Sequence, residues 1–340
     1  MRKKLLALSV IIVLISAIAG YWVFRQIFKH NTAFTGVSKV VFIDQSMEVD
    51  ALTAILEADS IIQNTHSFEI TCTIKRFSKF TKPGRYEIKR GASNQQIVNM
   101  FRIGNQSPVK VRFGAEKSLE QLAGKLGKIL RPDSIEFLMA IRNLTADPEL
   151  ALNEDILACI FFANTYEEFW TITPEEFIGK MKKNYITFWN DDRKKMAQLQ
   201  NLDPIKTYIL ASIVKGETVK MEEAPKIAGL YLNRLKNGTR LQADPTAVFG
   251  AGGDGVQRVT GQIAIDSRYN TYLIDGLPPG PIAFVGKEFL EAVLQPQSHD
   301  YIFMCAKPDF SGYHNFSISY SQHQQYAAEY HRALNARGIK

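Results

Sequence analysis

The pattern of apolar and polar residues is most regular between positions 203 and 217. Ile205, Ile209 and Ile213 recur every fourth residue, which predicts a helix with one buried face. The pair at 203–204, Asp followed by Pro, is typical of a helix start, with an N-cap residue and a proline in the first turn. One further step along the buried face reaches Glu217. The pattern therefore predicts a carboxyl group where another apolar residue would be expected.

Three physical effects act on such a carboxyl group. Burial disfavours its charged form and raises its pKa. Gly216 weakens the helix there, so Glu217 lies near the negative end of the helix dipole. Lys215 lies two residues away on a different face and does not neutralise it through the helix. We expect an acid that stays protonated near neutral pH, as general acid catalysis on a glycosidic oxygen requires. The alternative is an ordinary glutamate at a frayed helix end, because structural groups also acquire shifted pKa values.

The first thirty residues predict a membrane segment. Arg2, Lys3 and Lys4 precede an uncharged stretch at 5–24, and Arg25 follows it. Twenty apolar residues match the thickness of a bilayer core, and the leading positive cluster predicts a cytoplasmic N-terminus with the remainder exported. The alternative is a cleaved signal peptide, because the stretch at 17–19 resembles a cleavage site. In both cases the body of the protein works outside the cytoplasm.

The remaining pattern predicts two α+β units. In the first, at 38–108, the stretch 67–77 is compatible with a helix, but the alternation of Phe68, Ile70, Cys72 and Ile74 favours a strand. The second unit starts near 109 and combines several helices with an irregular stretch at 239–281 and a late hairpin. Its expected elements are a strand at 109–113, helices at 118–130, 134–141, 173–185, 204–217 and 222–236, hairpin strands at 301–306 and 313–317, and a closing helix at 319–335.

Composition and charge exclude several classes of protein. The net charge is +7, but the basic residues are spread along the chain, so nucleic acid is a poor candidate partner. Cys72, Cys159 and Cys305 have neither metal-ligand spacing nor a disulfide framework, so no metal and no cofactor is expected. The glycine-rich loop at 250–255 lacks the spacing of a phosphate-binding loop. A long irregular stretch in a compact domain is usually functional, so the stretch at 239–281 is expected to contribute to a site.

Several short motifs occur in a specific order along the chain. They are LASIVKGET (210–218), LNRL (232–235), LQADPT (241–246), YNTY (269–272), GLPPGPI (276–282) and HNF (314–316). Together with PGRYEIKRG (83–91) and NTY (164–166), their order and spacing resemble the YceG-like family of endolytic murein transglycosylases. The resemblance implies an α+β fold with a transmembrane anchor at 1–30, a small LysM-like α/β domain at 38–108 and a mixed α+β, lysozyme-like catalytic domain at 109–340.

The resemblance assigns the catalytic acid and base to Glu217. It implies that this residue donates a proton to the glycosidic oxygen between N-acetylmuramic acid and N-acetylglucosamine. The carboxylate then takes the proton of the muramic acid C6 hydroxyl, which closes a 1,6-anhydro ring without water. The chain departs from the usual family pattern at the two preceding positions, where Lys215 and Gly216 stand in place of a carboxylate and a lysine.

Most glycoside hydrolases need two carboxylates, so a second carboxylate could act together with Glu217. Asp244 is the best candidate, although its place before Pro245 favours a turn residue with a structural or substrate-orienting role. Glu222 and Glu223 open a helix and are expected to be solvated.

Amide and phenol side chains in the motifs suit sugar hydroxyl and N-acetyl groups. The proposed contacts are Asn233, Gln242, Tyr269, Asn270 and Tyr272. Asn233 and Asn270 could equally brace loops through backbone hydrogen bonds. His314 could orient a sugar or Glu217, but a single histidine near a hairpin is more often structural.

The sequence therefore predicts a single-pass protein of the cytoplasmic (inner) membrane, whose catalytic domain faces the outer, periplasmic side and limits glycan strand length. Its expected partners are peptidoglycan glycan strands, the membrane and the wall-synthesis machinery. Two alternatives remain open. One is a peptidoglycan-binding protein without activity, and the other is a muramidase that uses water.

Overall fold

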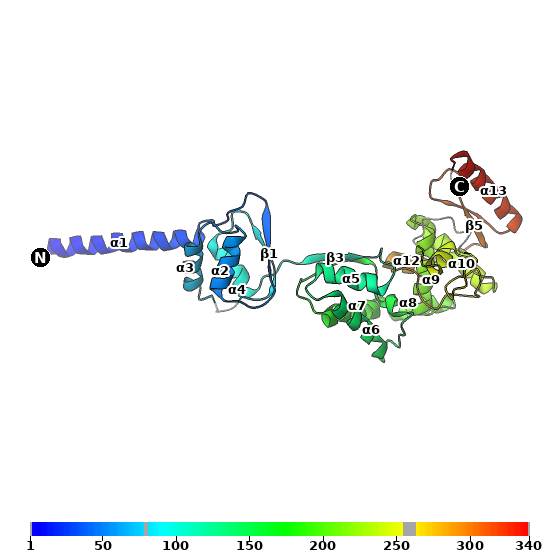
Figure 1. Ribbon diagram of the computed structural model, residues 1–340, viewed down its shortest axis with the longest axis horizontal. Coiled ribbons are helices and arrows are strands. Elements are labelled where there is room, and N and C mark those ends of the chain that lie inside the picture. Colours follow the sequence, from blue (N-terminus) through cyan, green and yellow to red (C-terminus); the bar gives the residue numbers. More distant parts are fainter. Residues whose placement is uncertain (1, 78–80, 254–262, 339–340) are drawn as a thin grey trace. The chain divides into compact units, whose positions relative to one another are not determined.

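The computed structural model describes residues 2–77, 81–253 and 263–338 (Figure 1). The fold is mixed α+β, as the sequence predicts, with many helices and three two-stranded sheets among the described residues. The chain divides into two compact units. The first contains residues 1–110, 129–131 and 167–172, and the second contains residues 111–128, 132–166 and 173–340.

The first unit begins with the predicted apolar helix, α1 (Arg2–Phe28). It is long and apolar enough to cross a membrane, and a signal sequence near the N-terminus would meet the same criterion. Its last turn packs against α3 and α4, because the backbone oxygen of Gln26 accepts hydrogen bonds from Thr71 and Asn94. The end of the apolar helix is therefore part of the folded unit.

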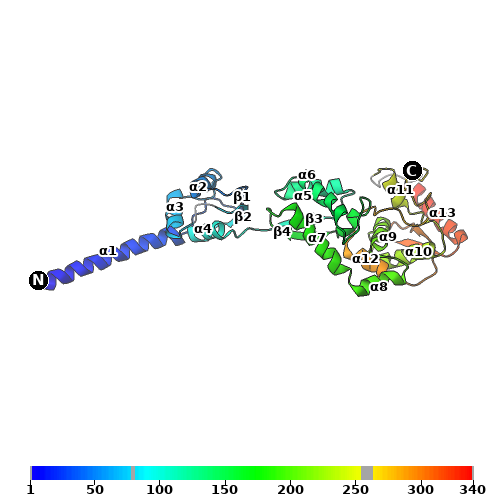
Figure 2. The same ribbon diagram turned by 90° about the horizontal axis from the view of Figure 1, so that it is seen from below.

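The rest of the first unit is a two-stranded antiparallel sheet covered by three helices. β1 (Ser38–Ile43) pairs antiparallel with β2 (Gly84–Lys89), with Val41 opposite Tyr86. Figures 1 and 2 show α2 (Val49–Ala58), α3 (Thr65–Ile74) and α4 (Asn94–Ile103) around this sheet. Alternate strand residues and one face of each helix form a single apolar core. Ser93 and Gln96 close a capping box at the start of α4 and satisfy backbone groups there.

The strand prediction for 67–77 is wrong, because this stretch lies mostly in helix α3. Asn64 accepts a hydrogen bond from the backbone of Ser67 and starts the helix. Phe68 and Cys72 are buried four residues apart, whereas Ile74 is exposed. The apparent alternation arose because both periods place Phe68 and Cys72 on the same side. The burial of Thr71 and the exposure of Ile74 fit the helical period and not the strand period.

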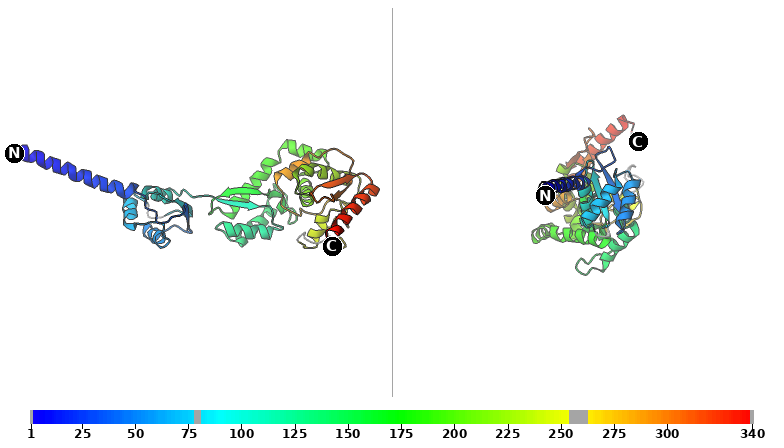
Figure 3. Two further views of the ribbon diagram at one scale, coloured as in Figure 1. Left: turned by 90° about the horizontal axis from the view of Figure 1, so that it is seen from above. Right: turned by 90° about the vertical axis from the view of Figure 1, so that its left-hand side faces the viewer.

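The second unit is mostly helical. Its 3-10 turns are η1 (Asn143–Ala146), η2 (Leu157–Ile160) and η3 (Met221–Glu223). β3 (Val109–Phe113) pairs with β4 (Asn164–Glu168), and residues 111–113 and 164–166 of these strands belong to this unit. The helices are α5 (Leu119–Ile129), α6 (Ser134–Arg142), α7 (Pro174–Phe188), α8 (Asp191–Leu199), α9 (Pro204–Glu217), α10 (Ala224–Lys236), α11 (Asp244–Gly250), α12 (Lys287–Leu294) and α13 (Tyr320–Ala336). The predicted late hairpin is confirmed as β5 (Phe303–Ala306) paired antiparallel with β6 (His314–Ser317). Figure 3 shows α13, in red, lying along it.

Helix α9 is the centre of this unit. It is confirmed at the predicted position, with the side chain of Asp203 accepting a hydrogen bond from the backbone of Lys206. The expectation of one buried face is too narrow, because every residue from Thr207 to Val214 is buried. Helices α8, α10, α11 and α12 all contact it, so no side of its central turns faces water (Figure 2).

Buried polar side chains of α9 are satisfied by a neighbouring extended segment. The Tyr208 hydroxyl donates to the backbone oxygen of Phe161 at 2.7 Å and accepts from the backbone N–H of Val285 at 3.0 Å. The Ser212 hydroxyl accepts from the backbone N–H of Ile282 at 3.0 Å. These bonds fix the segment 282–285 along the helix, because a buried backbone group without a partner is costly.

Replacing Tyr208 with Phe should therefore destabilise the protein. The change leaves the buried groups of Phe161 and Val285 without their partner, at a cost of about 1 to 3 kcal/mol in the free energy of unfolding. Urea denaturation of the full-length chain in detergent measures this. Tyr185→Phe is the matched control, because the described residues provide no hydrogen-bond partner for that hydroxyl. Equal effects of the two substitutions would contradict the account.

Candidate active site

Glu217 is the last residue of α9, where the fully buried helix ends. Val214, one turn earlier, is buried, whereas Glu217 is partly exposed. The backbone N–H of Thr218 bonds the oxygen of Val214 at 3.3 Å and closes the last turn. The carboxyl group of Glu217 therefore lies at the edge of the core, in a position that a ligand can reach.

Tyr231 is the hydrogen-bond partner of this carboxyl group. It lies on α10, is buried, and its hydroxyl donates to Glu217 Oε1 at 2.5 Å. Burial and the neighbouring carboxyl group raise the pKa of Tyr231 well above its ordinary value, so the phenol keeps its proton and remains a donor. Tyr231 is not among the residues predicted from the sequence. The available signal was its place on the helix predicted at 222–236, the next one after the Glu217 helix.

The pKa of Glu217 is raised from 4.5 to about 7. Burial is the largest cause, and the negative charge of Asp244 adds to it, whereas the hydrogen bond from Tyr231 and the positive charge of Arg234 act in the opposite direction. The prediction that burial raises the pKa of this carboxyl group is confirmed. Near neutral pH, Glu217 can therefore be present both as an acid and as a carboxylate.

Asp244 is the first residue of α11 and not a loop residue, so its assignment to a turn is wrong. Pro245 follows in the first helical turn, where a proline is well tolerated, and this converts the sequence Asp-Pro from a turn into a helix start. The side chain of Asp244 is exposed and accepts a hydrogen bond from the Tyr272 hydroxyl. Two tyrosine–carboxyl pairs, Tyr231 with Glu217 and Tyr272 with Asp244, thus interact electrostatically.

Gly216 and Lys215, the two residues before Glu217, each have a packing or hydrogen-bonding role. A Cβ atom at Gly216 would lie 2.6 Å from Cβ of Pro245, so the glycine lets the start of α11 approach the end of α9. The Lys215 ammonium donates to the backbone oxygens of Gly114 at 2.7 Å and Phe284 at 2.6 Å. Lys215 is therefore directed away from Glu217, as predicted.

Arg234 is a buried cation near the site that the sequence analysis did not identify. Its guanidinium donates to the backbone oxygens of Ile302 at 2.5 Å and Leu241 at 2.6 Å. Across the described residues, no Lys or Arg forms an ion pair with Glu217. Arg234 thus fixes the segments around the site and leaves the Glu217 carboxyl group able to titrate.

The predicted sugar contacts lie in different environments. The Asn233 amide donates to the backbone oxygens of His299 and Tyr301, and the buried Asn270 amide donates to those of Ile263 and Ile265. Both side chains brace the segments they contact. Gln242 is exposed, with a left-handed backbone (φ 48°). The Tyr269 ring packs on Phe249 with the ring centroids 4.9 Å apart. Contact of these residues with sugar stays a prediction.

The expectation that Glu223 is solvated is wrong. It is buried, and its carboxyl group bonds His314, both at Nδ1 (2.9 Å) and at the backbone N–H (3.1 Å). This contact joins the start of α10 to β6, so His314 has a structural partner. Glu222 is exposed and accepts a hydrogen bond from Tyr313.

Among the described residues, no group of three or more His, Cys, Asp or Glu side chains could hold a metal ion. Residues 254–262, including part of the glycine-rich loop, lie outside the described residues.

Comparisons with known proteins agree with one another. The model of the YceG-like family matches residues 41–329. An endolytic murein transglycosylase from Bacillus subtilis is 27% identical over 303 residues, which cover 78% of each chain. One from Streptococcus pneumoniae is 23% identical, and the match covers 90% of this chain and 61% of that protein. The crystal structure of a YceG-like protein from Listeria monocytogenes superposes with a TM-score of 0.58 at 24% identity, over 86% of this chain and 99% of that one. This last comparison shows a shared fold.

Replacing Gly216 with Ala should displace the start of α11. The new methyl group meets Pro245, and relief of this overlap is expected to cost about 1 to 3 kcal/mol in unfolding free energy. The control is Gly124→Ala in α5, where nothing lies within 4 Å of the added atom. That substitution should stabilise the helix by about 0.5 to 1 kcal/mol. Chemical denaturation distinguishes the two, and stabilisation by both would contradict the packing argument.

Replacing Glu217 with Gln should change how stability depends on pH. The folded state holds a proton on Glu217 up to a pKa of about 7, above its ordinary value of 4.5. Wild-type stability should therefore fall as pH rises from about 4.5 through 7, by up to about 3 kcal/mol. The Gln variant should lack this fall, so it should be the more stable protein at pH 8 and nearly equal to wild type at pH 4. Glu329→Gln, at an exposed position on α13, should change neither value.

Proposed function

Because the chain belongs to the YceG-like family, we propose that it is a membrane-anchored endolytic lytic transglycosylase of peptidoglycan. It cleaves the bond between N-acetylmuramic acid and N-acetylglucosamine within nascent glycan strands and leaves 1,6-anhydro ends, which limits strand length. The relatives named endolytic murein transglycosylase support the reaction class. The observation that supports the site is the carboxyl group of Glu217, with its pKa raised to about 7 at the partly exposed end of a buried helix.

Glu217 performs both proton transfers in this proposal. Its protonated form donates to the oxygen that leaves with the glucosamine unit as the bond to muramic acid C1 breaks. The resulting carboxylate takes the proton of the C6 hydroxyl, whose oxygen forms the new bond to C1. Glu217 ends protonated again, so the cycle consumes no water. A pKa near ambient pH suits a group that serves as acid and then as base.

Tyr231 orients the catalytic carboxyl group, and Asp244 acts on its charge. The Tyr231 hydroxyl holds Oε1 of Glu217 and stabilises the carboxylate that forms during the reaction. The negative charge of Asp244 keeps the pKa of Glu217 high before the reaction and favours the positive charge that develops on the sugar ring. Asp244 therefore has a substrate-orienting and electrostatic role, and its bond with Tyr272 fixes its position.

We extend the proposal to the whole chain. Residues 1–30 anchor it in the cytoplasmic membrane, the LysM-like domain at 38–108 holds glycan, and the lysozyme-like domain at 109–340 carries out catalysis on the outer face. The apolar helix α1 supports the anchor. Gln242, Tyr269 and Tyr272 line the approach to the scissile bond, and Asn233 and Asn270 brace the segments around it. An anchored enzyme meets newly made strands near the membrane, beside the wall-synthesis machinery.

A muramidase that uses water is the second candidate. The observation that favours it is Asp244, because a second carboxylate near the acid could activate water or act as a nucleophile. A binding protein without activity is less well supported. Lys215 and Gly216, beside the proposed acid, could point to lost activity. Both have packing or hydrogen-bonding roles that leave Glu217 in place.

Digestion of purified sacculi separates these three functions. Mass spectrometry of the products should show 1,6-anhydro ends with the wild-type chain, and Glu217→Gln should reduce cleavage by at least about 100-fold. Glu329→Gln should cleave as wild type does. Reducing ends would establish the muramidase, and absence of cleavage would establish the binding protein. Full activity of Glu217→Gln would show that another residue is the acid.

A further inference from the structure

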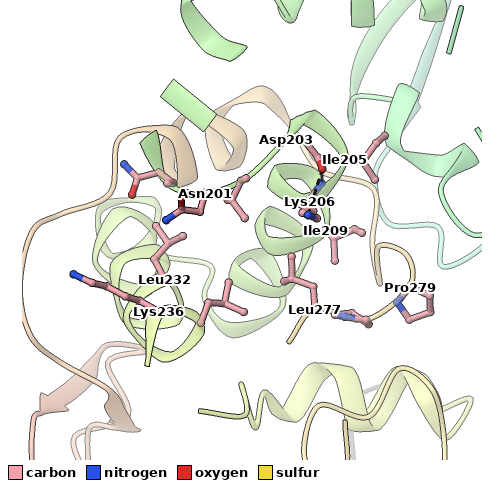
Figure 4. Close-up of a pocket in the computed structure, with 13 residues that line it drawn as sticks. Asn201, Asp203, Ile205, Lys206, Ile209, Leu232, Lys236, Leu277 and Pro279 are labelled. Atoms are coloured by element: carbon pink, nitrogen blue, oxygen red, sulfur yellow. Dashed lines mark hydrogen bonds and ion pairs between the residues drawn. The ribbon is translucent and has the colours of Figure 1, made fainter. Parts of the chain in front are cut away.

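A pocket of about 590 Å³ lies near the N-terminal half of α9 (Figure 4). Glu217, at the other end of this helix, does not line it. This volume is in the range of small-ligand sites. Its walls come from the segment 200–203 between α8 and α9, the start of α9, the end of α10 and the segment 277–279. The lining combines apolar side chains, among them Ile205, Ile209, Leu232, Leu235 and Leu277, with polar ones that include Asp203.

The pocket carries a positive charge at its rim. Lys206 and Lys236 line it from α9 and α10 and are both exposed (Figure 4). Lys236 has no partner among the described residues, and Lys206 lies 3.7 Å from Asp203. Asp203 also caps α9 through the backbone of Lys206, so its charge is directed toward the helix start. The chemistry fits a ligand with small apolar groups and more than one carboxylate.

A continuous, fixed segment joins this pocket to the active site. Leu277, Pro278 and Pro279 line the pocket, and a few residues later Ile282 bonds Ser212 and lies 3.7 Å from the position of a Cβ on Gly216. Phe284 then accepts a hydrogen bond from Lys215. The segment therefore runs along α9 from the pocket to the residue preceding Glu217.

The separation of the two sites matches a short peptide. Ile209 precedes Glu217 by eight residues and Ile205 by twelve, which corresponds to about 12 to 18 Å along a helix. An extended peptide of four or five residues spans about 13 to 18 Å. The length of such a peptide is thus similar to the separation of the two sites.

We propose that this pocket binds the stem peptide of the muramic acid unit at the cleavage site. This inference rests on the proposed function. The stem peptide starts at the lactyl group of muramic acid and carries alanine methyl groups and free carboxylates. The methyl groups pack on the leucine, isoleucine and proline wall, and the carboxylates pair with Lys206 and Lys236.

The test compares two glycan substrates. Peptide-bearing strands, and the same strands stripped by an amidase, are digested by the full-length chain in detergent. We expect wild type to have the higher kcat/KM on peptide-bearing strands, by roughly tenfold. The double charge reversal Lys206→Glu with Lys236→Glu should lower kcat/KM on peptide-bearing strands by about threefold to thirtyfold and leave stripped strands unaffected. The control is Lys194→Glu with Lys195→Glu, which makes the same charge change at exposed positions of α8.

The outcomes separate the two proposals. If wild type cleaves both substrates equally, or the pocket variant loses activity equally on both, the stem-peptide inference is wrong and the proposed function stands. Ligand-observed NMR with N-acetylmuramyl pentapeptide adds an independent readout. Binding that is lost in the pocket variant, together with no cleavage of either glycan, would support the pocket and overturn the proposed function. Neither binding nor cleavage would overturn both.

Discussion

The burial of α9 on every side is the constraint from which the site follows. A helix in this position must satisfy each polar group that it carries, and Tyr208, Ser212 and Lys215 do so by bonding backbone groups of flanking segments. Those bonds hold the segment 282–285 in place, and that segment covers the end of the helix. The backbone that carries Glu217 is consequently held in place before any substrate binds. Such preorganisation is what a catalytic group needs, because its geometry is not paid for during the reaction.

The pKa of Glu217 is set by effects that raise it and effects that lower it. Each carboxyl group, Glu217 and Asp244, has a tyrosine donor, and the two pairs come from four segments of the chain. Burial and the charge of Asp244 raise the pKa of Glu217, and Tyr231 and Arg234 lower it. Asp244 lies at the start of α11, which approaches the end of α9 where Gly216 packs against Pro245. This packing therefore sets the distance over which the charge of Asp244 acts on Glu217.

The sequence predicted what depends on local periodicity. The spacing of Ile205, Ile209 and Ile213 located α9 and placed Glu217 at its end, and burial was sufficient to predict the direction of its pKa shift. It could not predict that polar Thr207 and Ser212 would be buried as well, because that requires partners from segments some 70 residues away in the case of Ser212. The partners of Glu223 and Tyr231 could not be predicted for the same reason, because each is decided by a tertiary contact. The helical state of Asp244 had a local signal, because the same Asp-Pro pair at 203–204 indicates a helix start.

Lys215 has a consequence for comparing such sites between relatives. Its ammonium lies between two backbone oxygens, so a carboxylate at this position would face two acceptors without a donor. Replacement of Lys215 by a carboxylate would therefore require changes in the loops around Gly114 and Phe284. Successive side chains on a helix point in directions about 100° apart and meet different surroundings. The residue adjacent in sequence to a catalytic acid can thus evolve with distant loops, independently of the chemistry that its neighbour performs.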